Sequence, residues 1–195
     1  MKSRINQILE DINRKKDELI KEYTNLKEKY GFNIIKGKVV FNNKVRELNK
    51  VYKKSIIESI FTSTVRELLS APFIYAMIIP ALILDLFLFI YQNTFFRFLR
   101  IPFVKREDYF EYDRKKLDYL NGIQKFNCLY CSYVNGLFSY AVEIAGRTEM
   151  YWCPVKHAKK KNGGHDWEAY FADFGDPKGF KDTCNRVEVF YEQKN

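Results

Sequence analysis

The sequence predicts a mainly α-helical protein with one membrane segment. Three observations support this fold class. Residues 4–30 repeat apolar side chains at helical spacing, residues 71–91 form an almost continuous apolar run, and residues 132–147 again place apolar side chains at helical spacing. We therefore expect long amphipathic N-terminal helices, then one hydrophobic membrane helix or re-entrant hairpin, then a small helical C-terminal module with a Cys/His cluster.

Residues 4–30 fit a heptad repeat, and Gly31 can end the helix. Its inner positions are Leu9, Lys16, Tyr23 and Tyr30 at a, and Ile5, Ile12, Leu19 and Leu26 at d. We call the row of a and d side chains the seam. One lysine and two tyrosines among them make it a weak helix–helix contact. The repeat therefore fits two interpretations: an amphipathic helix that packs against its own chain, or a short coiled coil that forms a homodimer through residues 4–30.

Residues 32–41 contain two short β-type runs around Lys36-Gly37, which predict a hairpin or a linker. Asn42 or Asn43 can cap an amphipathic helix that continues to residue 70. Together with the segments on either side, this predicts four parts. They are an N-terminal helix at 1–31, a linker and amphipathic helix at 32–70, a membrane anchor at 71–100 and a Cys/His module at 101–195.

The apolar run at 71–91 is long enough to cross a membrane. Its 21 residues would rise about 30 Å as a helix, which is the hydrocarbon thickness of a bilayer. An aromatic and basic belt follows it, made of Tyr91, Phe95, Phe96, Arg97, Phe98 and Arg100. The sequence therefore predicts that membrane lipid is a partner.

Pro80 and Asp85 make this run irregular. A central proline kinks or breaks a helix, and an acid at membrane depth needs a partner. Both flanks of the run are basic, so the positive-inside rule favours both on one side. A single pass is the main interpretation, and a re-entrant hairpin that breaks at Pro80 is the alternative.

Charge and the N-terminal residues predict the location. The net charge is +9, which suits anionic lipid, and no nucleic-acid-binding motif is recognisable, so no nucleic acid partner is expected. The N-terminus lacks the apolar core of a secretory signal. We therefore expect the bacterial inner membrane, with the soluble parts in the cytoplasm, where cysteines stay reduced.

Two tight pairs of metal-ligand side chains lie between residues 127 and 157. Cys128 and Cys131 form a C-x-x-C, and Cys153 and His157 form a C-P-x-x-H. Three thiolates and one imidazole suit a structural zinc site, and an iron–sulfur cluster with one His ligand is the alternative cofactor. The sequence thus predicts metal ligation by Cys128, Cys131, Cys153 and His157.

This site depends on a chain reversal, because the residues between the two pairs themselves look helical. Asn135-Gly136 or the stretch Ala145–Thr148 could supply it. Three other arrangements stay open: Cys184 as the fourth ligand, a redox dithiol at Cys128 and Cys131, and cysteines that are simply buried apolar side chains.

The functional hypothesis is a membrane-anchored metal-binding module that binds or scaffolds a partner. One alternative is a membrane-bound thiol or iron–sulfur redox protein. Another is a lipid-modifying enzyme with its site near Asp85 or near His165, which lies among several acids in a Gly-rich turn. Residues 186–192 are expected to form a terminal strand.

The blocks LNGIQKFNCLYCSYVNG and GRTEMYWCPVKHA, within residues 112–158, resemble a group of uncharacterised bacterial membrane-associated proteins. The resemblance covers about the middle quarter of the chain. It implies a bacterial source and carries no activity or site residues with it.

Overall fold

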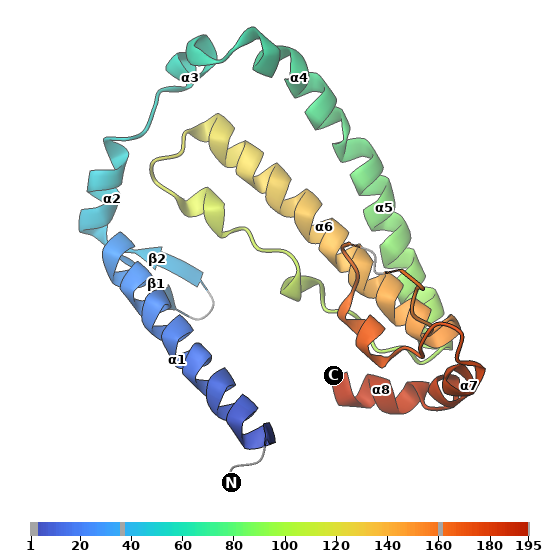
Figure 1. The fold of residues 1–195 in the computed structure, drawn as a ribbon. Coiled ribbons are helices and arrows are strands. Elements are labelled where there is room, and N and C mark those ends of the chain that lie inside the picture. Colours follow the sequence, from blue (N-terminus) through green and yellow to red (C-terminus); the bar gives the residue numbers. More distant parts are fainter. Residues whose placement is uncertain (1–3, 36–37, 160–161, 195) are drawn as a thin grey trace. The chain divides into compact units, whose positions relative to one another are not determined.

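The computed structural model describes residues 4–35, 38–159 and 162–194, and its architecture is mainly helical (Figure 1). The predicted turn at Lys36-Gly37 lies outside these residues. The chain separates into two compact units, Met1–Thr62 with Asp113–Lys125, and Ser63–Tyr112 with Phe126–Asn195. Each unit is described below by itself.

The first unit begins with the predicted long helix, α1 (Arg4–Tyr30), which ends at Gly31 with a φ of 60°. The hairpin prediction is confirmed: β1 (Phe32–Ile35) and β2 (Lys38–Phe41) pair antiparallel, with Phe32 opposite Phe41. Phe32 also packs edge-on against Tyr23, so the hairpin folds back onto the C-terminal part of α1.

The single helix predicted for residues 43–70 is wrong, because three helices occupy this stretch. They are α2 (Asn43–Lys50), α3 (Ile56–Thr62) and α4 (Val65–Ala76), and Asn42 caps α2 as expected. The start of α4 is encoded locally. The Thr64 side chain accepts from the Glu67 N–H and the Glu67 carboxylate accepts from the Thr64 N–H, a capping box that fixes a new helix start.

In the second unit, α4 leads directly into α5 (Ile78–Tyr91) and a short π-helical turn, Gln92–Phe96. By length and composition, Val65–Phe96 is the one helix in the described part of the chain that could cross a membrane. Pro80 lies in the first turn of α5, where the missing N–H is tolerated, and the helix is interrupted only at Met77. The chain keeps its direction through Pro80 (Figure 1), so the reversal of a re-entrant hairpin does not occur there.

Helix α6 (Gly122–Trp152) lies beside α4 and α5 and runs in the same direction (Figure 1). The rings of Tyr75 and Tyr130 are 6.0 Å apart, and the Tyr91 and Thr148 hydroxyls are 3.0 Å apart further along. Two parallel neighbours need a return segment, which residues 97–121 supply. Within this segment, Asp113–Lys116 form a 3₁₀ turn.

The C-terminal residues cover the end of α6 with a 3₁₀ turn (Asp166–Tyr170), α7 (Pro177–Asn185) and α8 (Val187–Lys194). The strand expected at 186–192 is therefore wrong, since α8 occupies it. The core of this unit brings together the end of α5, the return segment, α6 and these elements: Phe96, Ile101, Val104, Tyr140, Ile144, Met150, Trp167, Phe171 and Tyr191.

Candidate functional site

The four predicted metal ligands do not converge within the described part of the chain. Cys128 and Cys131 lie inside α6, and Cys153 follows its last residue. The 22 helical steps from Cys131 to Cys153 correspond to about 33 Å along the helix axis. His157 lies beyond Cys153 and is exposed. Among the described residues, no three His, Cys, Asp or Glu side chains form a group that could hold a metal. Metal binding remains a prediction from the sequence.

The missing reversal explains this separation. Gly136 and Gly146, proposed as breaking points, both lie inside the continuous α6. Their role is close approach rather than turning. A Cβ at Gly136 would lie 2.7 Å from the carbonyl oxygen of Tyr109, and one at Gly146 would lie 2.6 Å from Cγ of His165. The residues directly after Cys153 are not helical, since Val155 forms a β-bridge with Ala172.

The redox alternative relied on a C-x-x-C at a helix N-terminus, where the helix dipole favours a thiolate. Cys128 instead lies more than one turn inside α6, and all four cysteines are free thiols. The pair does share one helix face at i and i+3. The structural argument for a reactive dithiol is therefore weaker than the sequence suggested.

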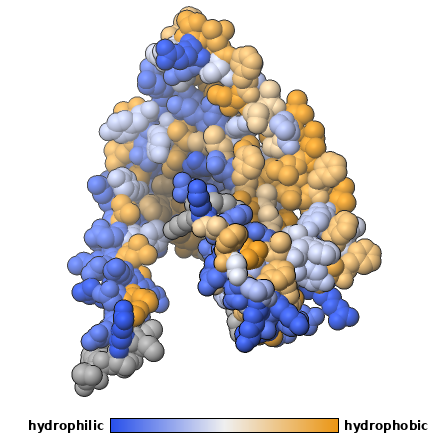
Figure 2. All heavy atoms as spheres, turned by 45° about the vertical axis from the view of Figure 1, so that its right-hand side comes forward, coloured by the Kyte–Doolittle hydropathy of each residue, from blue (hydrophilic) through white to orange (hydrophobic). Residues whose placement is uncertain are grey.

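An extended exposed apolar surface of the second unit lies on α4 and α5. We call it the anchor face, and Figure 2 shows hydrophobic residues gathered over this side. Its side chains are Leu68, Leu69, Phe73, Ile74, Met77, Ile79, Leu82, Ile83, Leu86, Phe87, Phe89 and Ile90. Such a continuous exposed patch marks a surface that another apolar phase covers.

Asp85 of α5 points the other way, towards α6 and the return segment. Asp85 accepts two hydrogen bonds from the Arg106 guanidinium, at 2.5 and 2.7 Å, and one from the Tyr133 hydroxyl at 2.8 Å. The hydrogen bond from Arg106 is the main cause that lowers the pKa of Asp85 below its usual value. Burial, together with the bond to Asp85, raises the pKa of Tyr133 to about 12. The acid therefore stays ionised and paired.

The polar side chains of Gln92 and Tyr75 also form hydrogen bonds within the protein. The Gln92 side chain is 6% exposed, and it donates to the carbonyl of Val104 and accepts from its N–H. Near the other end, the Tyr75 hydroxyl donates to Asn127, and the Tyr130 hydroxyl donates to the carbonyl of Ile74. Beyond its first two turns, helix α4–α5 thus exposes apolar side chains, while Tyr75, Asp85 and Gln92 bond to other parts of the protein.

A buried polar network fastens the C-terminal residues to the end of α6. Glu143 accepts from the Arg147 guanidinium at 2.8 Å and from the Trp167 indole at 2.9 Å. Arg147 also donates to the carbonyl of Pro102, and its own carbonyl accepts from the Tyr191 hydroxyl. Because these bonds reach the return segment, the 3₁₀ turn and α8, they fix three segments to one helix.

His165 belongs to the same region, and its side chain is 6% exposed. Its Nε2 lies 2.8 Å from the Glu149 carboxylate, while Nδ1 is buried without a hydrogen-bond partner. We assign the tautomer with the proton on Nε2, since a protonated and buried Nδ1 would lack an acceptor. Because Nδ1 is buried, it is not available to a substrate in this structure.

A shallow depression of about 420 Å³ lies next to this network, lined by Tyr109, Phe138, Ser139, Val142, Glu143, Gly163, Gly164, His165 and Asp166. It was the expected location for one version of a lipid-modifying enzyme. Glu143, its buried carboxylate, is already committed to Arg147 and Trp167. The lining also includes the carboxylate of Asp166 and the hydroxyl of Ser139, neither of which belongs to the Glu143–Arg147–Trp167 network.

The close approach at Gly146 gives a testable prediction. Gly146→Ala should lower the free energy of unfolding by about 1–3 kcal/mol, because the added methyl group overpacks the contact with His165. Gly122→Ala is the matched control, since its Cβ would meet nothing nearer than 3.5 Å. Chemical unfolding followed by circular dichroism measures both. Equal stability of the two variants would contradict the packing described here.

Comparison of the chain with protein-family models, with curated proteins and with solved structures found no match. The class of protein is therefore defined by its fold and surfaces alone. This is a mainly helical protein in which one long apolar helix directs Tyr75, Asp85 and Gln92 towards other parts of the protein.

The sequence hypotheses missed most residues of the two polar networks. A usable signal existed for Glu143 and Arg147, because an acid four residues before an arginine on a helix forms a favourable pair. Asp85 was recognised as needing a partner, but nothing local points to Arg106, which is 21 residues away. Tyr133 and Gln92 carried no local signal, since their bonds exist only once α5, α6 and the return segment meet.

Proposed function

We propose that the protein is a membrane-bound module that lies in one leaflet of a bilayer through its anchor face and holds residues 153–195 at the lipid surface. One observation carries this proposal. Helix α4–α5 exposes apolar side chains and turns Asp85, Gln92 and Tyr75 towards protein partners. A helix that faces water does the opposite, whereas lipid requires that every polar group be satisfied internally.

The return segment favours a helix in the plane of the membrane over one that spans it. Because α5 and α6 run in the same direction, residues 97–121 must travel back along the helices. Residues 97–112 are the part of this segment in the second unit, and 7 of these 16 residues are charged: Arg97, Arg100, Lys105, Arg106, Glu107, Asp108 and Glu111. In a spanning arrangement these charges would pass through hydrocarbon, at about 2.5–3.5 kcal/mol for each one near the centre.

Charge supports the same location. The chain carries a net charge of +9, and the exposed side chains of Arg97, Arg100 and Lys105 follow the end of α5. Basic residues next to an embedded segment are attracted by anionic headgroups, at about 1 kcal/mol each. The cytoplasmic leaflet of a bacterial inner membrane offers such headgroups.

A protease-protection experiment tests the in-plane arrangement. One variant carries a protease recognition sequence between Tyr52 and Lys53, and a second carries it after Gly163; both positions are exposed. In sealed inverted membrane vesicles, we expect added protease to cut both variants, because both ends of α4–α5 stay on one side of the bilayer. Cleavage of only one variant before detergent is added would show a spanning helix and overturn the in-plane arrangement.

A further inference from the structure

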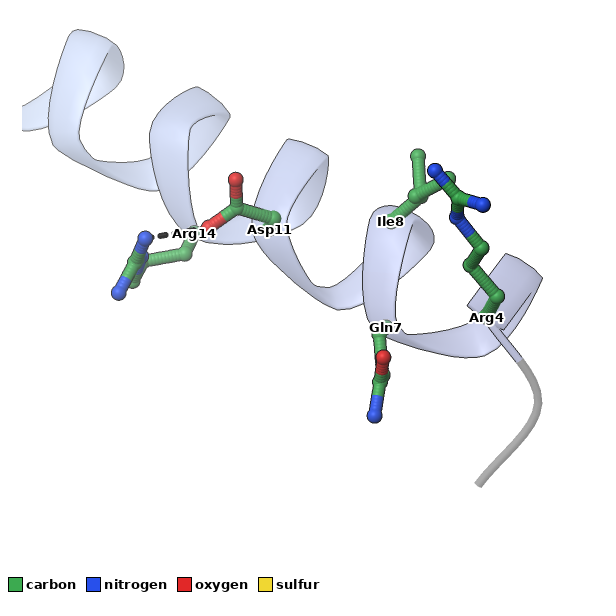
Figure 3. Close-up of a pocket in the computed structure, with 5 residues that line it drawn as sticks. All are labelled: Arg4, Gln7, Ile8, Asp11 and Arg14. Atoms are coloured by element: carbon green, nitrogen blue, oxygen red, sulfur yellow. Dashed lines mark hydrogen bonds and ion pairs between the residues drawn. The ribbon is translucent and has the colours of Figure 1, made fainter. Parts of the chain in front are cut away.

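Helix α1 presents an apolar seam that the described part of the chain leaves exposed, apart from the edge-on contact of Phe32 with Tyr23. No described side chain of α1 is buried, and Ile8, Ile12, Leu19, Ile20 and Leu26 are exposed. Figure 3 shows the first turns of the helix, where Asp11 pairs with Arg14. Asp11 and Arg14 occupy heptad positions c and f, so their ion pair lies away from the seam.

We infer that α1 forms an antiparallel two-helix coiled coil with α1 of a second copy of the chain, with the residue numbers of facing positions adding to 35. This register overlaps residues 5–30 of both copies completely. It goes beyond the membrane proposal and does not depend on it.

The single polar core position decides against a parallel pair. In a parallel dimer Lys16 would face Lys16 of the second copy in one core layer, and two like charges there destabilise the pairing. In the antiparallel register Lys16 faces Leu19, and Tyr23 faces Ile12. Each lysine can then extend its charged end past a leucine to water.

The flanking positions carry complementary charges in the same register. In an antiparallel pair, g positions face g positions, which places Lys15 opposite Glu22 twice by symmetry. Both side chains are exposed in the single chain. A parallel pair would instead bring Glu22 towards Lys27 at e and leave Lys15 opposite Ile20. The two orientations therefore depend on different charge pairs.

The hairpin adds an independent reason. It packs against the C-terminal part of α1, where Phe32 contacts Tyr23. A parallel pair would bring the hairpins of both copies to the same end of the seam. An antiparallel pair places the two hairpins at opposite ends, so each hairpin lies beside the N-terminal half of the other α1, which carries no hairpin.

Charge reversal in the full-length protein, purified in a mild detergent, tests the orientation. The dimer dissociation constant is measured by sedimentation at several protein concentrations. We expect Lys15→Glu and Glu22→Lys each to weaken the dimer about ten-fold, since each converts two attractive pairs into two repulsive ones. The double variant Lys15→Glu/Glu22→Lys should restore the affinity of the unmodified protein. Far-ultraviolet circular dichroism verifies that α1 remains helical.

The double variant Glu22→Lys/Lys27→Glu is the matched comparison, because only a parallel pair would be rescued by it. Rescue by this variant and not by the first would overturn the antiparallel orientation. A monomer at all concentrations would overturn the dimer itself. Leu19→Asp, an exposed substitution within the seam, should yield monomers in either orientation.

Discussion

Replacing Phe73, Ile79 and Phe87 of the anchor face by aspartate should release the protein from lipid vesicles. These side chains are 79%, 61% and 64% exposed, so in the proposed arrangement they lie in lipid. Each substitution removes an apolar side chain from lipid and places a charge near hydrocarbon, which weakens the free energy of membrane binding by about 5 kcal/mol per position. Flotation with vesicles of neutral and anionic lipid measures the bound fraction, which should fall from nearly all to nearly none.

The matched control replaces Val51, Tyr52 and Phe174 by aspartate. These side chains are 83%, 78% and 68% exposed, but they lie outside α4–α5. Both triple variants lower the net charge equally, so general attraction to anionic lipid changes by the same amount. The control should keep floating with the vesicles. Equal loss in both variants, or continued flotation of the anchor-face variant, would rule out the anchor face as the membrane contact.

Removing the Arg106 side chain should destabilise the second unit more than removing any other exposed cation of the return segment. Arg106→Ala leaves the Asp85 carboxylate on an apolar helix with only the Tyr133 hydroxyl as a partner. Breaking a buried ion pair costs 3–5 kcal/mol, and because Arg106 is about half exposed we expect about 2 kcal/mol. Chemical unfolding in detergent measures the loss. Lys105→Ala, which removes the neighbouring exposed cation, should change stability by less than about 0.5 kcal/mol.

The double variant Asp85→Leu/Arg106→Leu distinguishes the effect of an unpaired Asp85 charge from the effect of losing the ion pair itself. It removes both charges, so it should unfold at nearly the denaturant concentration of the unmodified protein. Acid gives a second readout. The pKa of Asp85 is lowered in the fold, so its contribution to stability is complete above about pH 4, the unfolded value, and disappears as pH falls through the lower folded value. Loss of stability that is identical in the double variant would show that another group titrates.

The sequence predicted much of the helical architecture, because periodic apolar spacing and capping residues act locally. The heptad of α1, the β1–β2 hairpin, the cap at Asn42 and the apolar helix could all be recognised in this way. The single helix at 43–70 was wrong, although Thr64 and Glu67 formed a readable capping box. The terminal strand was wrong as well, since β-branched residues at 187–189 also fit the short amphipathic helix that packs Tyr191 into the core.

The candidate site was harder to predict, because the important contacts join residues far apart in the chain. Cysteine spacing suggested convergence, but a continuous α6 keeps Cys131 and Cys153 at opposite ends. The glycines that looked like turns, Gly136 and Gly146, instead allow the return segment and His165 to approach the helix closely. In the sequence, a glycine that breaks a helix and a glycine that allows a close contact within a helix look the same. Only the residue that packs against it in the fold distinguishes the two.

The sequence by itself determined that residues 71–91 would form an apolar helix, because hydrophobicity and helical rise are properties of the segment alone. Only the tertiary structure decided which way its polar residues point and that α6 runs parallel to it. The parallel arrangement forces a charged segment to return along the helices, and this is the physical reason for proposing a helix that lies in the membrane plane. Direction and pairing depend on contacts between residues that are 21 to 57 positions apart, which no local pattern records.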